Sequence, residues 1–191
     1  VEPFEIPPDW RRIRAIDFGY NNPFVCQWWA IDGDGRMYLY RELYGVQKLV
    51  SDWAKEINAL SAGEHIEFTV ADHDAEDRAT LAREGISTIA AKKDVSVGIQ
   101  RVQEKMRVDA TGKPSIFFAN DALMYEDARL RDSLRPASTV EEITGYIWQA
   151  GAKREHPTKE HDHGMDAMRY AVMALSENRT ATYSRNNPFF K

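Results

Sequence analysis

The chain has 191 residues, of which 43% are hydrophobic, and it carries a formal net charge of −5 with a sequence pI near 5.6. This size and composition are sufficient for one domain with a buried core. The acidic net charge argues against a largely basic surface that binds nucleic acid, although it allows a local basic groove. No apolar run approaches the roughly 20 residues that a membrane-spanning helix needs. We therefore expect no membrane partner.

The first residues and the single cysteine bear on the origin of the chain. Residue 1 is Val rather than Met, and the stretch "VEPFEIPPDW" is Pro-rich, as linkers often are. We interpret the chain as a piece of a longer polypeptide, with residues 1–12 as a linker from a domain that precedes it. Cys26 has no partner for an internal disulfide, so we expect a buried structural thiol in an unsecreted protein of a reducing compartment.

The first third of the chain predicts a β-meander. Alternating apolar runs at 13–19, 24–31 and 36–44 are joined by short polar stretches with Asn, Asp and Gly, which favour turns. A helix is then expected over 46–60, where Leu49, Trp53 and Ile57 recur at helical spacing, followed by a strand over 66–72.

Strands and helices alternate through the rest of the chain. The patterns predict helices at 75–85, 95–108, 122–134 and 162–178, strands at 86–91 and 115–121, a strand or hairpin arm at 143–151, and a tail at 179–191. A meander followed by alternating β and α elements is typical of an α/β fold. We expect a mixed sheet, with an antiparallel three-strand meander followed by parallel strands, flanked by helices.

Two aspartates stand where the predicted strands end. In "RIRAIDFG", Asp17 interrupts an apolar strand, and a buried ionised carboxylate is costly unless it is paired or binds a metal. Asp72 ends the strand at 66–72, and open α/β sheets usually bind ligands at the carboxyl ends of their strands. A turn or a helix cap is the alternative role for Asp72.

The final predicted helix adds a third acid and a histidine. In "HDHGMDAMRYAVMAL", His163, Asp166 and Tyr170 share one helical face. Asp162 is a plausible N-cap, and Asp166 would gain from the helix dipole whatever its function. Together, Asp17, Asp72 and Asp166 form an oxygen-rich set that suits Mg²⁺ or Mn²⁺, and two such ions can support phosphodiester hydrolysis.

The sequence resembles the nuclease domain of tailed-phage large terminase subunits. The resemblance runs from "AIDFGYNNPFVCQWWAIDGDGRMYLYRELY" through "VADHDAEDRATLAREGI" and "AKKDVSVGIQRVQEKM" to "GYIWQAGAKREHPTKEHDHGMDAMRYAV". It implies a ribonuclease H-like fold over 13–178, with Asp17, Asp72 and Asp166 as metal ligands and His163 as a further site residue. The acids in "ADHDAEDR" leave open whether Asp74 replaces or joins Asp72. We favour Asp72, because Asp74 begins the next helix and is placed to cap it.

The same resemblance implies an activity and partners. Such an enzyme cuts concatemeric double-stranded viral DNA in the host cell cytoplasm, while an N-terminal ATPase domain of the same polypeptide pumps the DNA. Portal protein and a small terminase subunit would be further partners. The chain contains no G-x-x-x-x-G-K-[ST] loop, so it is not that motor by itself.

Basic residues near the predicted site are candidates for DNA contact. Two groups precede helices, and solvated surface is the alternative for each; their members are Lys92, Lys93, Lys153, Arg154 and Lys159. Among other functions, a resolvase or transposase core is the nearest rival, and a docking module without nuclease activity is another. An actin-like ATPase needs two similar domains and a Gly-rich adenosine site, for which the chain is too short.

Overall fold

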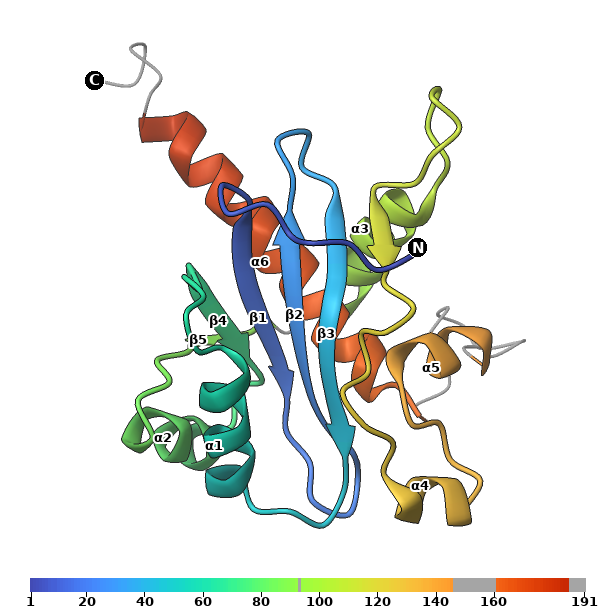
Figure 1. Ribbon diagram of the computed structural model, residues 1–191. Helices are drawn as coiled ribbons and strands as arrows, with labels where there is room; N and C mark the ends of the chain where they lie inside the picture. Colours follow the sequence, from blue (N-terminus) through green and yellow to red (C-terminus); the bar gives the residue numbers. More distant parts are fainter. Residues whose placement is uncertain (93, 146–160, 186–191) are drawn as a thin grey trace.

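The computed structural model describes residues 1–92, 94–145 and 161–185. Within these residues a six-stranded sheet of order β5-β4-β1-β2-β3-β6 forms the centre, with helices on both faces (Figure 1). The strands are β1 (Arg11–Asp17), β2 (Phe24–Ile31), β3 (Met37–Gly45), β4 (Phe68–Ala71), β5 (Ile89–Ala90) and β6 (Ile116–Phe118). The helices are α1 (Val50–Leu60), α2 (Ala75–Arg83), α3 (Val95–Met106), α4 (Ala128–Asp132), α5 (Thr139–Gly145) and α6 (His163–Arg185). No described helix is long and apolar enough to cross a lipid bilayer.

The order and direction of the strands confirm the predicted mixed sheet. β1, β2 and β3 form an antiparallel meander, and β4 and β5 extend it in parallel from the β1 side. β6 lies parallel to β3 at the opposite edge. Ile16 of β1 pairs with Ala71 of β4, so the residues that follow these two positions emerge side by side at one end of the sheet.

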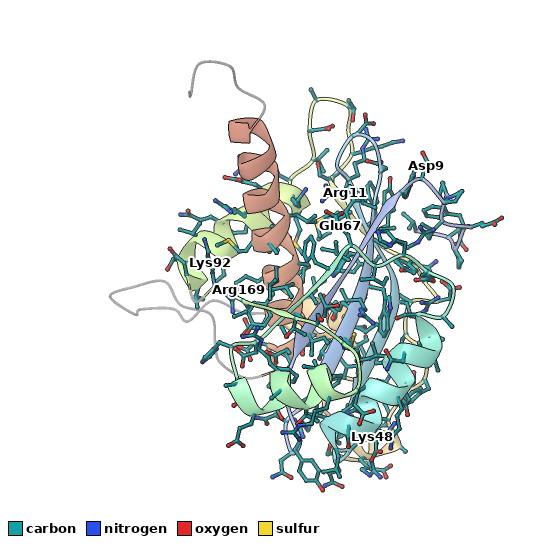
Figure 2. The ribbon with its side chains drawn as sticks, turned by 90° about the vertical axis from the view of Figure 1, so that its left-hand side faces the viewer. Asp9, Arg11, Lys48, Glu67, Lys92 and Arg169 are labelled. Carbon is teal, nitrogen blue, oxygen red and sulfur yellow. The ribbon has the colours of Figure 1, made fainter. Side chains whose placement is uncertain are left out.

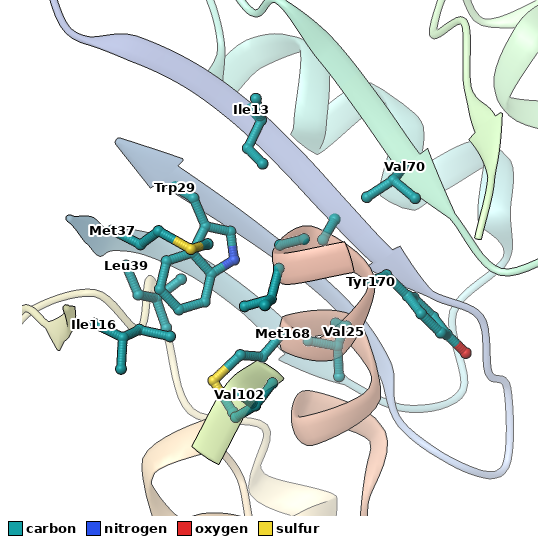
Figure 3. Close-up of a cluster of buried hydrophobic side chains, with 14 of the residues drawn as sticks. Ile13, Val25, Trp29, Met37, Leu39, Val70, Val102, Ile116, Met168 and Tyr170 are labelled. Carbon is teal, nitrogen blue, oxygen red and sulfur yellow. The ribbon is translucent and has the colours of Figure 1, made fainter. Parts of the chain in front are cut away.

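Alternate residues of the strands supply two hydrophobic cores, one on each face of the sheet. Ile13 and Ala15 of β1 belong to the core beneath α3 and α6, part of which is shown in Figure 3. Ile16 belongs to the core beneath α1 and α2, as does Cys26, which is fully buried as expected. Because strand side chains alternate between faces, β1 and β2 are buried on both sides and read as nearly continuous apolar runs.

Two predicted elements are wrong in part. The helix expected over 122–134 is reduced to α4, because the residues before it pair with β3: Glu42 N–H donates to Ala122 O at 2.6 Å, and Met124 N–H donates to Glu42 O at 3.0 Å. These bonds satisfy backbone N–H and C=O groups of β3 at the sheet edge. The gain from this pairing outweighs the helix propensity of residues 122–127. Residues 143–145 end α5 instead of starting a strand, and 146–151 lie outside the described residues.

The described structure extends on both sides of the predicted domain at 13–178. β1 begins at Arg11, and the residues before it lie across the sheet, where Trp10 and Tyr38 have ring centroids 5.0 Å apart (Figure 1). The Arg12 guanidinium donates to the carbonyls of Ile6 and Pro7, each at 3.1 Å. At the other end, α6 runs to Arg185, past the predicted end at 178, since no Gly or Pro interrupts this stretch.

Candidate metal and active site

Asp17 is the last residue of β1 and remains only 7% exposed. Its Oδ2 lies 2.9 Å from Nδ1 of His163, and its Oδ1 accepts a hydrogen bond from the Tyr170 hydroxyl at 3.2 Å. Both partners come from α6, which crosses behind the strands in Figure 1. The acid that interrupts the apolar strand is therefore paired with the face of α6 that the sequence singled out.

Asp72 directly follows β4 and lies next to the end of β1. Its backbone N–H donates to Ile16 O at 3.0 Å, which continues the parallel pairing by one residue and brings Asp72 beside Asp17. The Asp72 side chain is turned to its neighbour, with Oδ1 2.5 Å from Nδ1 of His73. Asp74 instead caps α2, where its side chain accepts the N–H groups at the start of the helix. This is the role expected for Asp74, so Asp72 remains the stronger candidate for the site.

The first two turns of α6 carry the other predicted residues. His163 is the first residue of the helix, and Asp166 lies one turn later. Asp166 accepts hydrogen bonds from the Arg169 guanidinium at 3.2 Å and 2.9 Å. Arg169 was not anticipated as a site residue, although its spacing from Asp166 is the i, i+3 spacing of helical ion pairs.

Burial dominates the electrostatics of the site. It raises the pKa of Asp17 to about 6, a rise to which the charges of Asp166 and Asp72 add and which the His163 hydrogen bond opposes. Burial also raises the pKa of Asp166, against the opposing charge of Arg169. For His163, burial lowers the pKa, but the hydrogen bond and charge of Asp17 outweigh burial and leave the pKa raised. Because the charges of Asp72 and Asp166 both act on Asp17, a cation beside Asp17 would be favoured.

The fit of these residues to a metal ion is incomplete as they stand. Carboxylate oxygens are the donors that Mg²⁺ and Mn²⁺ prefer. Yet among the described residues no group of three or more His, Cys, Asp and Glu side chains is close enough together to hold an ion. Instead, the Asp72 side chain is paired with His73 and the Asp166 side chain with Arg169. Asp72 lies beside Asp17 in the sheet, and the charge of Asp166 acts on Asp17. To share an ion with Asp17, each of these side chains would leave its present partner.

Of the predicted DNA-contacting residues, the structure describes Lys92. It is exposed and lies between β5 and α3, two residues past the carboxyl end of β5 (Figure 2). Because β5, β4 and β1 are parallel, Lys92 lies at the same end of the sheet as Asp17 and Asp72. The other candidates fall outside the described residues; they are Lys93, Lys153, Arg154 and Lys159.

Two further buried acids adjoin the start of α6 and were not anticipated. Glu42 of β3 is 1% exposed and Glu142 of α5 is 2% exposed. Burial raises the pKa of each to about 7, although hydrogen bonds oppose the rise. The sequence held one signal of Glu42, a carboxylate within the apolar strand "MYLYRELYG".

The mixed sheet, with its antiparallel meander extended by parallel strands and its flanking helices, is the ribonuclease H-like fold of phage large terminase nuclease domains. The phage P22 large terminase nuclease domain aligns with a TM-score of 0.69 and 20% identity over 92% of this chain and 87% of that one. The nuclease of the thermophilic phage G20c large terminase, solved with bound cobalt, aligns with a TM-score of 0.58 and 15% identity over 87% and 82% of the two chains.

A longer protein shares the same fold over part of its length. The large terminase of another thermophilic bacteriophage, solved in complex with ADP, aligns with a TM-score of 0.72 and 22% identity over 92% of this chain. The match covers 42% of that longer terminase, so the present chain spans less than half its length. No protein-family model and no curated protein matches the sequence.

Proposed function

We propose that the chain is the metal-dependent endonuclease domain of a viral DNA-packaging terminase, which cuts concatemeric double-stranded DNA when packaging begins and ends. The observation that carries the proposal is the buried Asp17 at the end of a central strand, beside Asp72 and in contact with His163 of α6. The fold shared with terminase nuclease domains supports the same assignment.

Asp17, Asp72 and Asp166 would hold Mg²⁺ or Mn²⁺, and we propose two ions. The cobalt bound to the G20c nuclease supports a divalent ion at a site on this fold. When bound, such ions would stabilise the negative charge that develops on a phosphodiester and lower the pKa of an attacking water. Without an ion, His73 lies at an oxygen of Asp72, and the Arg169 guanidinium pairs with Asp166.

His163 and Tyr170 prepare Asp17 for this role. The Tyr170 hydroxyl donates to one carboxylate oxygen of Asp17, and His163 lies at the other, so the carboxylate plane is fixed from two sides. With a divalent ion held by Asp17, the charge of Asp17 would favour the protonated form of His163 less than it does without an ion. A neutral imidazole at this place can orient the attacking water or accept its proton.

Double-stranded DNA is the proposed substrate, with Lys92 on the described surface and Lys93, Lys153, Arg154 and Lys159 as further phosphate contacts. We propose an N-terminal ATPase domain in the same polypeptide, since the longer phage terminase that contains this fold was solved with ADP. Portal protein and a small terminase subunit would complete the motor, in the cytoplasm of the host cell.

Nicking of a supercoiled plasmid with Mn²⁺ tests the proposal. Asp17→Asn should abolish nicking and weaken Mn²⁺ binding measured by calorimetry, while the circular dichroism spectrum stays that of the wild type. Asp34→Asn is the matched control, because Asp34 lies exposed in the turn between β2 and β3, at the other end of β2 from Asp17. A wild-type chain that never nicks DNA would instead support the docking-module alternative, and nicking by Asp17→Asn at the wild-type rate would contradict the site.

His163→Ala separates a role in proton transfer from a role in metal binding. General-base catalysis contributes about 10²–10⁴-fold, so the rate should fall at least about tenfold. Mn²⁺ affinity should stay near the wild-type value. Loss of Mn²⁺ binding in the variant would make His163 a ligand. A cleavage rate equal to that of the wild type from about pH 6 to 9 would leave His163 only a structural role.

A further inference from the structure

The first turn of α6 is held by a buried polar cluster, which we call the α6 clamp and define as Gln27, Glu42, Tyr44, Thr139 and Glu142. Its members come from β2, β3 and α5, and they are buried or nearly so. None of them belongs to the acid site described above. The clamp therefore calls for its own explanation, since buried carboxylates are costly unless they are hydrogen-bonded.

Glu142 joins α5 to the start of α6. Its Oε2 accepts the backbone N–H of Met165 at 2.9 Å, and its Oε1 accepts the Tyr44 hydroxyl at 2.5 Å. The N–H of Met165 is one of the first N–H groups of a helix, which have no partner within the helix. A carboxylate at this end also complements the helix dipole. Glu142 thus acts as a capping group supplied by another helix.

Gln27 holds the same turn from the other side. Its amide donates to Gly164 O at 2.9 Å and to the Thr139 hydroxyl oxygen at 2.6 Å. The Thr139 hydroxyl in turn donates to Glu42, which also accepts the Thr139 N–H at 3.2 Å. Glu42 therefore keeps Thr139, and through it Gln27, in position. Together these bonds fix both a backbone donor and a backbone acceptor of the first turn of α6.

The contact between α5 and α6 is close. A Cβ added to Gly164 would lie 2.2 Å from Thr139 Oγ1 and 2.9 Å from Thr139 Cα. The glycine therefore lets the two backbones approach and brings Met165 N–H within reach of Glu142. His163 directly precedes Gly164, and Asp166 directly follows Met165. Any displacement of this turn moves both site residues relative to Asp17.

We propose that Glu142 is a positioning residue of the nuclease site, whose carboxylate holds the first turn of α6 and so keeps His163 in contact with Asp17, and Asp166 one turn further along the helix. The inference rests on the proposed function for its link to metal binding, but the helix-holding role can be measured without it. Residues that orient the ligands of a metal site commonly change metal affinity by about 10–100-fold when they are removed.

Two readouts test the role, amide hydrogen exchange in α6 of the metal-free protein and Mn²⁺ affinity by calorimetry. Glu142→Ala should speed exchange in the first turn of α6 at least about tenfold and weaken Mn²⁺ binding by about 10–100-fold. Glu142→Gln keeps an acceptor for Met165 N–H and should stay within a few-fold of the wild type. Asp94→Ala is the matched control, because Asp94 caps α3 through Val97 N–H and its loss should leave both readouts for α6 unchanged.

Tyr44→Phe tests the clamp if Glu142→Ala does not fold. It removes the hydroxyl that donates to Glu142 and should produce the same changes at smaller size. Wild-type exchange and wild-type Mn²⁺ affinity in Glu142→Ala, or in Tyr44→Phe when it alone folds, would overturn the proposal. A loss in Glu142→Gln as large as that in Glu142→Ala would also overturn it. If the wild type binds no Mn²⁺, the proposed function fails, and hydrogen exchange still decides the role of Glu142.

Discussion

Asp17 and Glu42 are both carboxylates buried in strands of the same sheet, but their surroundings differ. Asp17 lies at a strand end beside Asp72, and near Asp166, with His163 as a titratable partner. Glu42 lies within β3, and its carboxylate is hydrogen-bonded by uncharged donors of Thr139 and Gln27. An acid among other acids suits a cation, whereas an acid among neutral donors suits a structural network.

The raised pKa of Glu42 predicts that stability falls as pH rises. Burial raises this pKa from its ordinary value of 4.5 to about 7, so the folded chain holds the proton more tightly than the unfolded chain over that window. The free energy of unfolding should therefore decrease from about pH 5 to about pH 7, by up to about 3 kcal/mol from Glu42 alone. Urea unfolding in EDTA at several pH values measures the decrease.

Glu42→Gln isolates this contribution, because Gln does not titrate. The stability of the variant should decrease less with pH than that of the wild type. Some decrease should remain, because Asp17 and Glu142 also have raised pKa values, about 6 and about 7. Glu67→Gln makes the same substitution at a carboxylate on the surface, where it pairs with Arg11, and should keep the wild-type decrease. Equal slopes in Glu42→Gln and the wild type would contradict the prediction.

At the scale of elements, α6 serves the core and the site at once. Its side chains Met168, Ala171 and Val172 are buried against the sheet, and its first turns carry His163 and Asp166. The same packing that stabilises the helix therefore sets the distance between these residues and Asp17. The contact with α5 at Gly164 leaves no room for an added Cβ.

Gly164→Ala tests that contact. Alanine has the better helix propensity by about 1 kcal/mol, but its Cβ would meet Thr139 Oγ1 at 2.2 Å and Thr139 Cα at 2.9 Å. Overpacking of this kind costs about 1–3 kcal/mol, so we expect a net loss of stability in urea unfolding. Gly33→Ala is the control, since no atom lies within 4 Å of its added Cβ. Gly164→Ala with wild-type stability would mean that α5 and α6 can move apart freely.

At the scale of the whole molecule, the segment before β1 is part of the packed domain. Trp10 contacts Phe4 and Tyr38, with ring centroids 5.8 Å and 5.0 Å apart, and Tyr38 stacks on Phe117 at 4.9 Å. Residues 1–10 thus lie over β3 and β6 (Figure 1). A preceding domain would be attached through a segment that is itself fixed to the sheet edge.

Trp10→Ala measures how firmly this segment is attached. Loss of the aromatic contacts should lower the free energy of unfolding by about 1–2 kcal/mol. Val108→Ala removes a side chain that is 60% exposed and should change stability by less than about 0.5 kcal/mol. Equal stability of Trp10→Ala and the wild type would show that residues 1–10 add nothing to the domain, as the linker interpretation expects.

The sequence by itself predicted the features that depend on local spacing. Apolar alternation predicted the meander, and helical patterns predicted α1, α2, α3 and α6. The place of Asp74 at the start of a predicted helix indicated its role as a cap. Asp17 was conspicuous because a single carboxylate interrupted an apolar strand. The shared face of His163, Asp166 and Tyr170 followed from helical geometry alone, and in the structure His163 and Tyr170 contact Asp17.

Only the tertiary structure decided how those side chains are paired. Tyr44 and Glu142 are 98 positions apart, and Gln27 and Gly164 are 137 apart, so no local pattern connects them. The pairing of Asp72 with His73 and of Asp166 with Arg169 likewise depends on side-chain rotamers and charges in the assembled site. The helix expected over 122–134 gave way because β3 needed backbone partners at its edge, and strand pairing between distant segments outweighs local propensity.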